Sequence, residues 1–235
     1  MPCCLAVPPS ERCGGTRPFG GTTPAPGGAG FSRRRYMTLT EETPVPQAAL
    51  PVEAFKAHLR LGTGFAEAQV QDAVLESFLR AAMAAIEART GKILIRRDFS
   101  WRLVRWQSGE GQALPVAPVV SLDAVTLIDR EGGEAPVPLA RLRLEPDDQR
   151  PVLRPQGGQM PGIPTGGAVR VHFVAGMATD WGGLPADLAQ AVLLLAAHYY
   201  EYRHETALSG GCMPFGVTSL IERYKTVRLL AGRGA

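Results

Sequence analysis

The sequence predicts an α+β fold, in which N- and C-terminal helices form a helical bundle and a small antiparallel β-domain is inserted between them. Apolar residues recur at helical spacing before residue 92 and again after residue 184, whereas between these regions they alternate with polar residues. The 235 residues are 45% hydrophobic and 20% charged, which is enough apolar material for one generous core or two small ones. The expected order is therefore helices, β-domain, helices.

Residues 1–36 show neither helical nor strand periodicity. They contain thirteen Gly or Pro, five arginines and one acid, so we expect this stretch to be disordered. The whole chain carries a formal charge of +3, but without this stretch the remainder carries −1. We expect Met37 to be the natural start and the preceding residues to be a non-native extension; a functional basic arm is the alternative. Only Cys212 lies outside this stretch, which excludes a disulfide framework and favours a reducing compartment.

Residues 37–91 are expected to hold the N-terminal helices. Phe55 and Leu59 lie one turn apart and predict a short helix, and a longer helix follows up to Gly91, a typical C-terminal stop. The longer helix carries two adjacent apolar stripes, Val70, Val74, Phe78, Ala81 and Ala85 in one and Leu75, Leu79, Met83 and Ile86 in the other. An apolar face this wide predicts packing on more than one side of the helix.

Residues 92–176 are expected to form the inserted β-domain. The alternation of Ile93, Ile95, Phe99, Trp101 and Leu103 with polar residues predicts a long half-buried strand, in which Arg97 is the exception. The segments 113–129, 135–146 and 168–176 resemble further strands, and turn residues separate them. We therefore expect an antiparallel sheet.

Residues 177–235 are expected to hold the C-terminal helices. A helix begins after Leu184, with Pro185 in its first turn, and carries an apolar stripe that ends at Tyr199 and Tyr202. The Ser219-x-x-Glu222 pattern is a capping box, which predicts a last helix over residues 220–230. No apolar run reaches the roughly 18 residues that a membrane span needs.

The pair Glu201 and His204 has the spacing that di-iron carboxylate proteins use on one helix. The sequence offers no second Glu-x-x-His, so half of such a ligand set is missing. Asp147 and Asp148 lie in a Pro-rich loop, where adjacent carboxylates usually point apart into solvent. We therefore expect no catalytic residues, no metal and no cofactor, and hence no enzyme; a small metalloenzyme using Glu201 and His204 is kept as an alternative.

The C-terminal helix is rich in cations, with Arg223, Lys225 and Arg228 in the helix and Arg233 beyond it. A solvated face explains them, because cations stabilise the C-terminal end of a helix. Contact with an acidic partner or with DNA phosphate is also possible. A small DNA-binding module therefore stays open as a second alternative.

Four blocks in order carry a family resemblance: AFKAHLRL, QDAVLESFLRAAMAAIEARTGKIL, VRVHFVAGMATDWGGLPADLAQAVLLLAAHYYEYRHE and PFGVTSLIERYKTVRL. Together they resemble the head-tail connector, or adaptor, proteins of long-tailed bacteriophages. The resemblance is greatest to the adaptor of the gene transfer agents of alphaproteobacteria. It covers residues 38–230 and rests on the order of the blocks, not on a catalytic signature.

The resemblance implies a structural subunit of a ring, typically a dodecamer, that links the portal of a phage-like particle to the next tail-proximal protein, the stopper. DNA would pass through its channel without sequence-specific binding, and no membrane would be involved. The protein would be cytoplasmic during assembly in the producing cell and then part of the released particle. We expect the free protein to be mostly monomeric, with the portal acting as the template for ring closure.

The resemblance also suggests two sets of contact residues, although no motif assigns them. The candidate portal-binding residues are Phe215, Leu220, Tyr224, Lys225 and Arg228, in the C-terminal segment. The candidate subunit-subunit contacts are Tyr199, Tyr202 and Arg203, because aromatic residues and Arg are favoured at interfaces.

Overall fold

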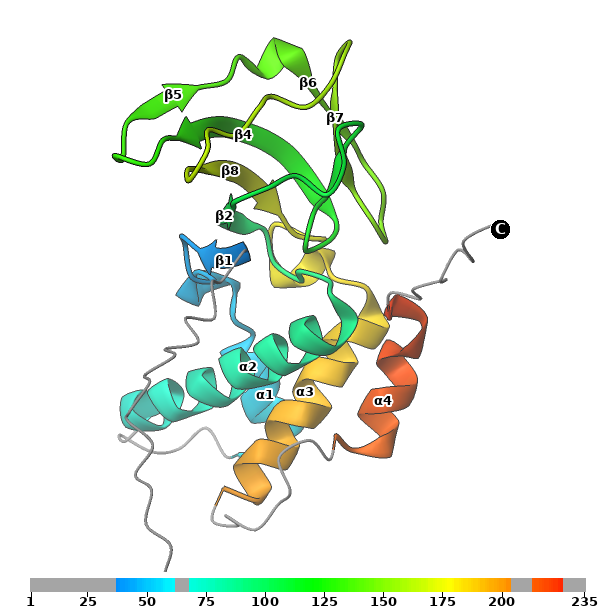
Figure 1. The fold of residues 1–235 in the computed structure, drawn as a ribbon. Coiled ribbons are helices and arrows are strands. Elements are labelled where there is room, and N and C mark those ends of the chain that lie inside the picture. Colours follow the sequence, from blue (N-terminus) through cyan, green and yellow to red (C-terminus); the bar gives the residue numbers. More distant parts are fainter. Residues whose placement is uncertain (1–36, 62–67, 204–212, 226–235) are drawn as a thin grey trace, which may run out of the picture. The chain divides into compact units, whose positions relative to one another are not determined.

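The computed structural model describes residues 37–61, 68–203 and 213–225, without the side chains of residues 68–70 (Figure 1). These residues belong to the compact unit Arg35–Ala235. The expectations for residues 1–36 and for Cys212, His204, Arg228 and Arg233 therefore lie outside the described residues.

The described residues form a mixed α and β fold, which confirms that part of the prediction. The helices are α1 (Val52–His58), α2 (Ala68–Thr90), α3 (Ala186–Glu201) and α4 (Phe215–Ile221), with short 3-10 turns η1 (Gln47–Ala49), η2 (Leu139–Arg141), η3 (Trp181–Gly183) and η4 (Glu222–Tyr224). The strands are β1 (Met37–Glu41), β2 (Arg97–Leu103), β3 (Gln112–Ala113), β4 (Val119–Ile128), β5 (Glu134–Pro136), β6 (Leu142–Glu145), β7 (Val152–Pro155) and β8 (Ala168–Ala175).

Helix α2 buries one of its two apolar stripes fully and the other in part. Leu75, Leu79 and Ile86 are at most 1% exposed, as expected for the stripe that faces the core. In the other stripe Val74 is 42% exposed and Ala81 is also exposed, whereas Phe78 and Ala85 are partly buried against the core of the helices. The helix ends where expected, because Gly91 has a φ of 71° and its N–H donates to the carbonyl of Glu87.

Helix α3 lies between α2 and α4, and the helices share one apolar core (Figure 1). Leu188, Val192 and Leu195 of α3 are at most 1% exposed in this core. The end of η4 is hydrogen bonded to Asp187 in the first turn of α3, so the α4–η4 segment runs antiparallel to α3. The last turn of α3 and the first residue of α4 consequently lie at the same end of this helix pair.

The inserted region forms two antiparallel sheets around a second apolar core. The larger sheet has the strand order β1-β2-β8-β4-β5, and the smaller has the order β3-β7-β6. The register of β2 and β8 agrees with the alternation of apolar and polar residues along them. Trp101 lies opposite Val171 and Phe99 opposite Phe173, and all four side chains are buried. The antiparallel β-region is thus confirmed. Strand β1 was not expected; it comes from residues before the helices and pairs with β2.

The predicted strand over residues 93–103 is wrong at its start, because β2 begins at Arg97. Ile93 contributes to the core of the sheets, whereas Leu94 and Ile95 contribute to the core of the helices. The alternation before Arg97 therefore reflects a chain that crosses from one core to the other, not a strand with two faces.

The predicted last helix over residues 220–230 is wrong at its start, and its residues 226–230 lie outside the described residues. Helix α4 begins at Phe215, directly after Pro214, and Ser219 lies inside it instead of capping it. Within the described chain helical structure ends at Tyr224, since Lys225 has extended backbone with φ −63° and ψ 132°. Proline fixes a backbone angle that suits a helix start, and here it outweighs the capping box five residues later.

Candidate functional site

The C-terminal end of the described chain is fastened to α3 through Tyr224. The Tyr224 hydroxyl donates to Asp187 Oδ1 at 2.8 Å and accepts from Arg223 Nη2 at 2.5 Å. Arg223 Nη2 also lies 2.7 Å from Asp187 Oδ2. Burial is the largest effect on the pKa of Tyr224 and raises it, which keeps the phenol protonated and able to donate. Tyr224 therefore holds the base of the C-terminal segment in place.

Of the five candidate portal-binding residues, Arg228 lies outside the described residues, and the structure does not bring the other four together. Leu220 is half-buried against the core of the helices, and Lys225 is ion-paired with Glu222 at the same end as Tyr224. Phe215 lies at the opposite end of the segment, on the order of 15 Å away at 1.5 Å per residue. It is 87% exposed, which is unusual for a side chain of this size. Portal binding by these residues stays a prediction.

The candidate subunit-contact residues lie in and just after the last turn of α3. Tyr199 is half-buried, and burial raises its pKa. Tyr202 is 42% exposed and Arg203 is also exposed. The guanidinium of Arg203 lies 4.8 Å from the ring centre of Tyr200, and Tyr200 makes an edge-to-face contact with Phe78 of α2 at 6.0 Å.

Tyr200 was not singled out from the sequence, although its ring packs against the guanidinium of Arg203. The stripe pattern picked out Tyr199 and Tyr202, and Tyr200 falls between them. Because α3 and α4–η4 are antiparallel, Phe215 begins at the end where Tyr202 and Arg203 finish. We call these three exposed residues, Tyr202, Arg203 and Phe215, the aromatic end.

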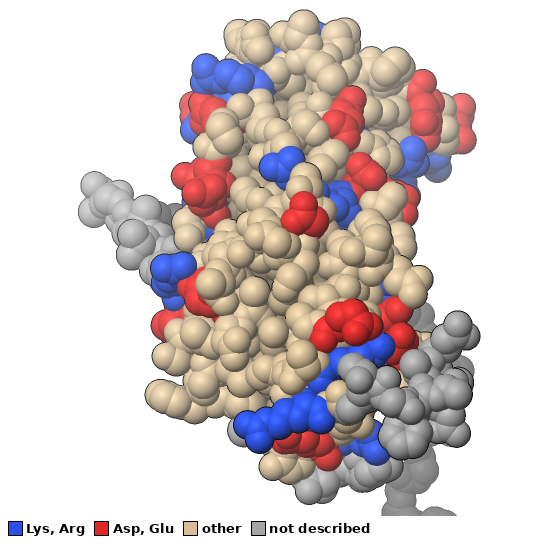
Figure 2. All heavy atoms as spheres, turned by 180° about the vertical axis from the view of Figure 1, so that it is seen from behind, with Lys and Arg blue, Asp and Glu red and all other residues tan. Residues whose placement is uncertain are grey.

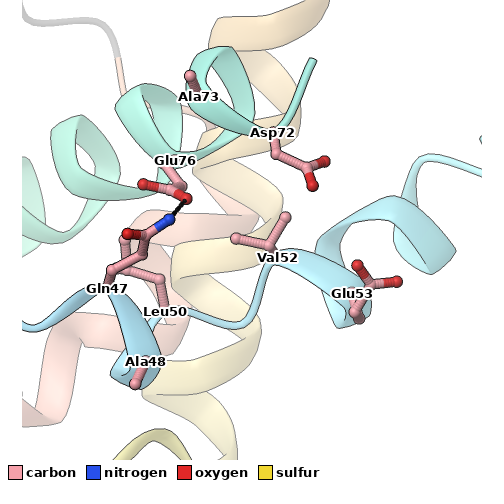
Figure 3. Close-up of a pocket in the computed structure, with 8 residues that line it drawn as sticks. All are labelled: Gln47, Ala48, Leu50, Val52, Glu53, Asp72, Ala73 and Glu76. Atoms are coloured by element: carbon pink, nitrogen blue, oxygen red, sulfur yellow. Dashed lines mark hydrogen bonds between the residues drawn. The ribbon is translucent and has the colours of Figure 1, made fainter. Parts of the chain in front are cut away.

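A hollow of about 530 Å³ lies between the η1–α1 segment and α2 (Figure 3). Its lining residues are Gln47, Ala48, Leu50, Val52, Glu53, Asp72, Ala73 and Glu76. Half of these are apolar and three are carboxylates. We call it the acidic hollow; no motif in the sequence pointed to it, because its walls come from separate segments.

The carboxylates of the acidic hollow are only partly neutralised. Gln47 Nε2 donates to Glu76 Oε1 at 2.6 Å, and Lys56 Nζ lies 2.6 Å from Asp72 Oδ1 and 2.9 Å from Glu53 Oε1. The hydrogen bond to Asp72 is the main cause that raises the pKa of Lys56. One ammonium therefore serves two carboxylates, and Glu76 has an amide as its partner. The rim keeps negative charge that can attract a cation.

The chemistry that a metalloenzyme would need is not assembled in the described residues. Within residues 37–61, 68–203 and 213–225 no three His, Cys, Asp or Glu side chains gather as a metal site would require. Glu201 is exposed, but its proposed partner His204 lies outside the described residues. Asp147 stabilises a turn: its Oδ1 accepts hydrogen bonds from the N–H groups of Gln149 and Arg150, each at 2.6 Å.

Charges of both signs are mixed on the face seen in Figure 2, where Lys and Arg alternate with Asp and Glu. Two cations that follow α4 have acidic partners, since Arg223 pairs with Asp187 and Lys225 with Glu222. Among the described helices, none combines the length and apolarity that crossing a bilayer requires.

The described chain thus combines two apolar cores with two exposed features, the aromatic end and the acidic hollow. No protein-family model and no curated protein matches the chain. Solved structures do match it. The chain is 54% identical to a subunit in the neck of an empty GTA particle computed with C6 symmetry, with a TM-score of 0.75. The match covers 84% of this chain and all of that subunit. The chain belongs to the family of neck proteins of gene transfer agent (GTA) particles.

Two further structures agree. A subunit in the neck of the native GTA particle, computed with C12 symmetry, is 50% identical with a TM-score of 0.71, over 84% of this chain and all of that one. A subunit in the virion of the native particle is 54% identical with a TM-score of 0.72, over 83% of this chain and 99% of that one. These relatives are structural virion proteins, and their symmetry supports a ring oligomer in the particle. The resemblance seen in the sequence is confirmed to this extent.

Proposed function

We propose that the chain is the adaptor subunit of a head-tail connector ring, which links the portal of a phage-like particle to the tail and continues the DNA channel. The observation that carries this proposal is the 50% identity to a whole neck subunit of the native GTA particle in a structure computed with C12 symmetry. That symmetry supports a ring of twelve copies. The helices around their shared core would act as the helical bundle of each subunit.

The portal and the tail-proximal stopper protein are the proposed partners on the two sides of the ring. We assign the portal contact to the segment that follows Tyr224, with Lys225 and Arg228 as steering charges. Leu220 and Tyr224 would support this segment from within the subunit, because both have partners in its own fold. Phe215 lies at the other end of α4, so we do not assign it to the portal contact.

The mixed surface charge supports a channel through which DNA passes without sequence-specific contacts. A DNA-binding module is less well supported, because Arg223 and Lys225 already have carboxylate partners. The protein would assemble in the cytoplasm of the producing cell and leave as part of the particle, as its relatives in the virion suggest.

Analytical ultracentrifugation of the full chain, alone and mixed with its cognate portal ring, tests the proposal. We expect the free chain to sediment mostly as a monomer and to co-sediment with the portal at about one adaptor per portal subunit. As a matched control, a chain that ends at Lys225 should keep its melting temperature and lose the co-sedimentation. A full chain that stays separate from the portal would contradict the proposal, and stoichiometric iron or manganese in it would favour the metalloenzyme.

A further inference from the structure

We infer that the aromatic end of one subunit docks into the acidic hollow of the next copy of this chain, and that this head-to-tail contact closes the ring. The inference rests on the proposed function, because it requires a ring. It names the surfaces by which that ring forms.

A closed ring of identical subunits needs two different patches, one on each side of every subunit. The two patches defined above meet this requirement. The acidic hollow lies against α1 and α2, and the aromatic end belongs to α3 and α4; α3 separates α2 from α4 (Figure 1). The two patches therefore come from different helices of the same subunit.

Ring closure also requires that the patches lie at one level, because an axial offset would produce a helical filament. The contact between Phe78 and Tyr200 places the first half of α2 beside the last turns of α3. The hollow uses Asp72, Ala73 and Glu76 from that half of α2. Both patches thus lie at the same end of the helices.

The chemistry of the patches is complementary. Phe215 is an apolar side chain that its own subunit leaves 87% exposed, and the hollow offers Ala48, Leu50 and Val52 as apolar surface. Arg203 brings a cation to a rim that carries Glu53, Asp72 and Glu76. Aromatic residues and Arg are also the types that contribute most at interfaces. A second copy therefore suits the hollow better than a neutral ligand.

Cross-linking within the assembled ring tests the contact. In a full chain whose four native cysteines are Ser, the pair Phe215→Cys and Ala48→Cys is assembled on the portal and treated with a short bismaleimide. We expect a ladder of covalent multimers that extends to twelve subunits, the number that the C12 relative implies. The pair Phe215→Cys and Val120→Cys is the control, because Val120 on β4 is 45% exposed but lies in the sheet; it should give no ladder.

Charge exchange provides a second measurement. Glu53→Arg or Arg203→Glu alone should weaken ring assembly on the portal by about tenfold or more, and the two together should restore it. The Glu53 side chain is 83% exposed, so its replacement should leave the melting temperature unchanged.

The outcomes separate this inference from the proposed function. Rings that electron microscopy shows on the portal but that give no ladder, or a cross-link from Phe215→Cys to the portal itself, would overturn the docking contact and leave the adaptor role intact. A chain without these substitutions that forms no ring on its portal would overturn both.

Discussion

Arg97 and Glu87 form a two-pronged ion pair between the two cores, with Nη2–Oε2 at 2.6 Å and Nη1–Oε1 at 2.9 Å. Each residue is only 8% exposed. Glu87 Oε1 also accepts the N–H of Leu94, and Glu41 of β1 lies 2.8 Å from Arg97 Nε. Desolvation is the largest single effect on the pKa of Arg97 and lowers it, but the bonds and charges of Glu87 and Glu41 together raise it. This cluster connects α2 and β1 to β2.

Glu87→Leu should lower the free energy of unfolding by about 3–5 kcal/mol, because it leaves the guanidinium buried without its main partner. Replacing both residues by Met should recover most of that loss, since no buried charge then remains. Urea unfolding measures both. The control is Arg143→Ala, whose exposed pair with Glu145 should be worth less than about 1 kcal/mol. Equal losses for the single and the double variant would show that the pair itself stabilises the fold.

The sequence marked Arg97 as the exception in an alternating pattern but could not supply its partners. Glu87 belongs to the preceding helix and Glu41 to a strand that precedes both helices, and no periodicity connects residues that only the tertiary fold brings together. Strand β1 was missed for the same reason. All five of its residues are exposed, and its pairing with β2 defines it.

Gly176→Ala should destabilise the protein by more than about 1 kcal/mol, because both the backbone angle of this residue and the space around it require glycine. Its φ is 148°, and an added Cβ would lie 2.4 Å from the Cα of Arg96. Gly216→Ala is the matched control; its Cβ would meet nothing within 4 Å in helix α4, where Ala is favoured by about 0.5–1 kcal/mol. Melting temperatures should therefore shift in opposite directions, and a shared direction would contradict this interpretation.

Asp147→Asn should flatten the acid limb of the stability curve. The backbone N–H groups of Arg150 and then Gln149 lower the pKa of Asp147 below its usual 3.8. A lowered native pKa gives stability that is present above the unfolded-state pKa and is lost as pH falls through the native value. Asn can still accept the same hydrogen bonds but does not titrate in this range. Urea midpoints from about pH 5 down to pH 2 measure the effect; identical curves for both proteins would contradict it.

The candidate interaction surfaces could be predicted from the sequence only in part. The helical stripe led to Tyr202, and the preference of interfaces for Arg led to Arg203, both of which are exposed. The sequence grouped Phe215 with Tyr224 as candidate portal contacts, although α4 and η4 place them at opposite ends of one segment; their portal binding stays a prediction. The acidic hollow escaped notice because Gln47, Glu53 and Glu76 are unremarkable in sequence and become neighbours only when η1 and α1 pack on α2.

Helix α4 carries an exposed side chain at its first residue, Phe215, and a buried one at its last residue, Ile221. Ile221 is fully buried against the core of the helices, so Ile221→Ala should cost about 2–5 kcal/mol of unfolding free energy. Phe215→Ala removes a larger side chain that is 87% exposed, and should change the unfolding free energy by less than about 0.5 kcal/mol.

The same two variants should differ in the opposite sense in assembly. On the portal, Phe215→Ala should form rings at least about tenfold less well than the unaltered chain, because the ring contact loses its aromatic anchor. Ile221→Ala, examined at a temperature where it stays folded, should form rings normally, because its side chain faces the interior of its own subunit. If Phe215→Ala proved as destabilising as Ile221→Ala, the phenyl ring would have a partner within its own chain, and the aromatic end would lose its place in the ring contact.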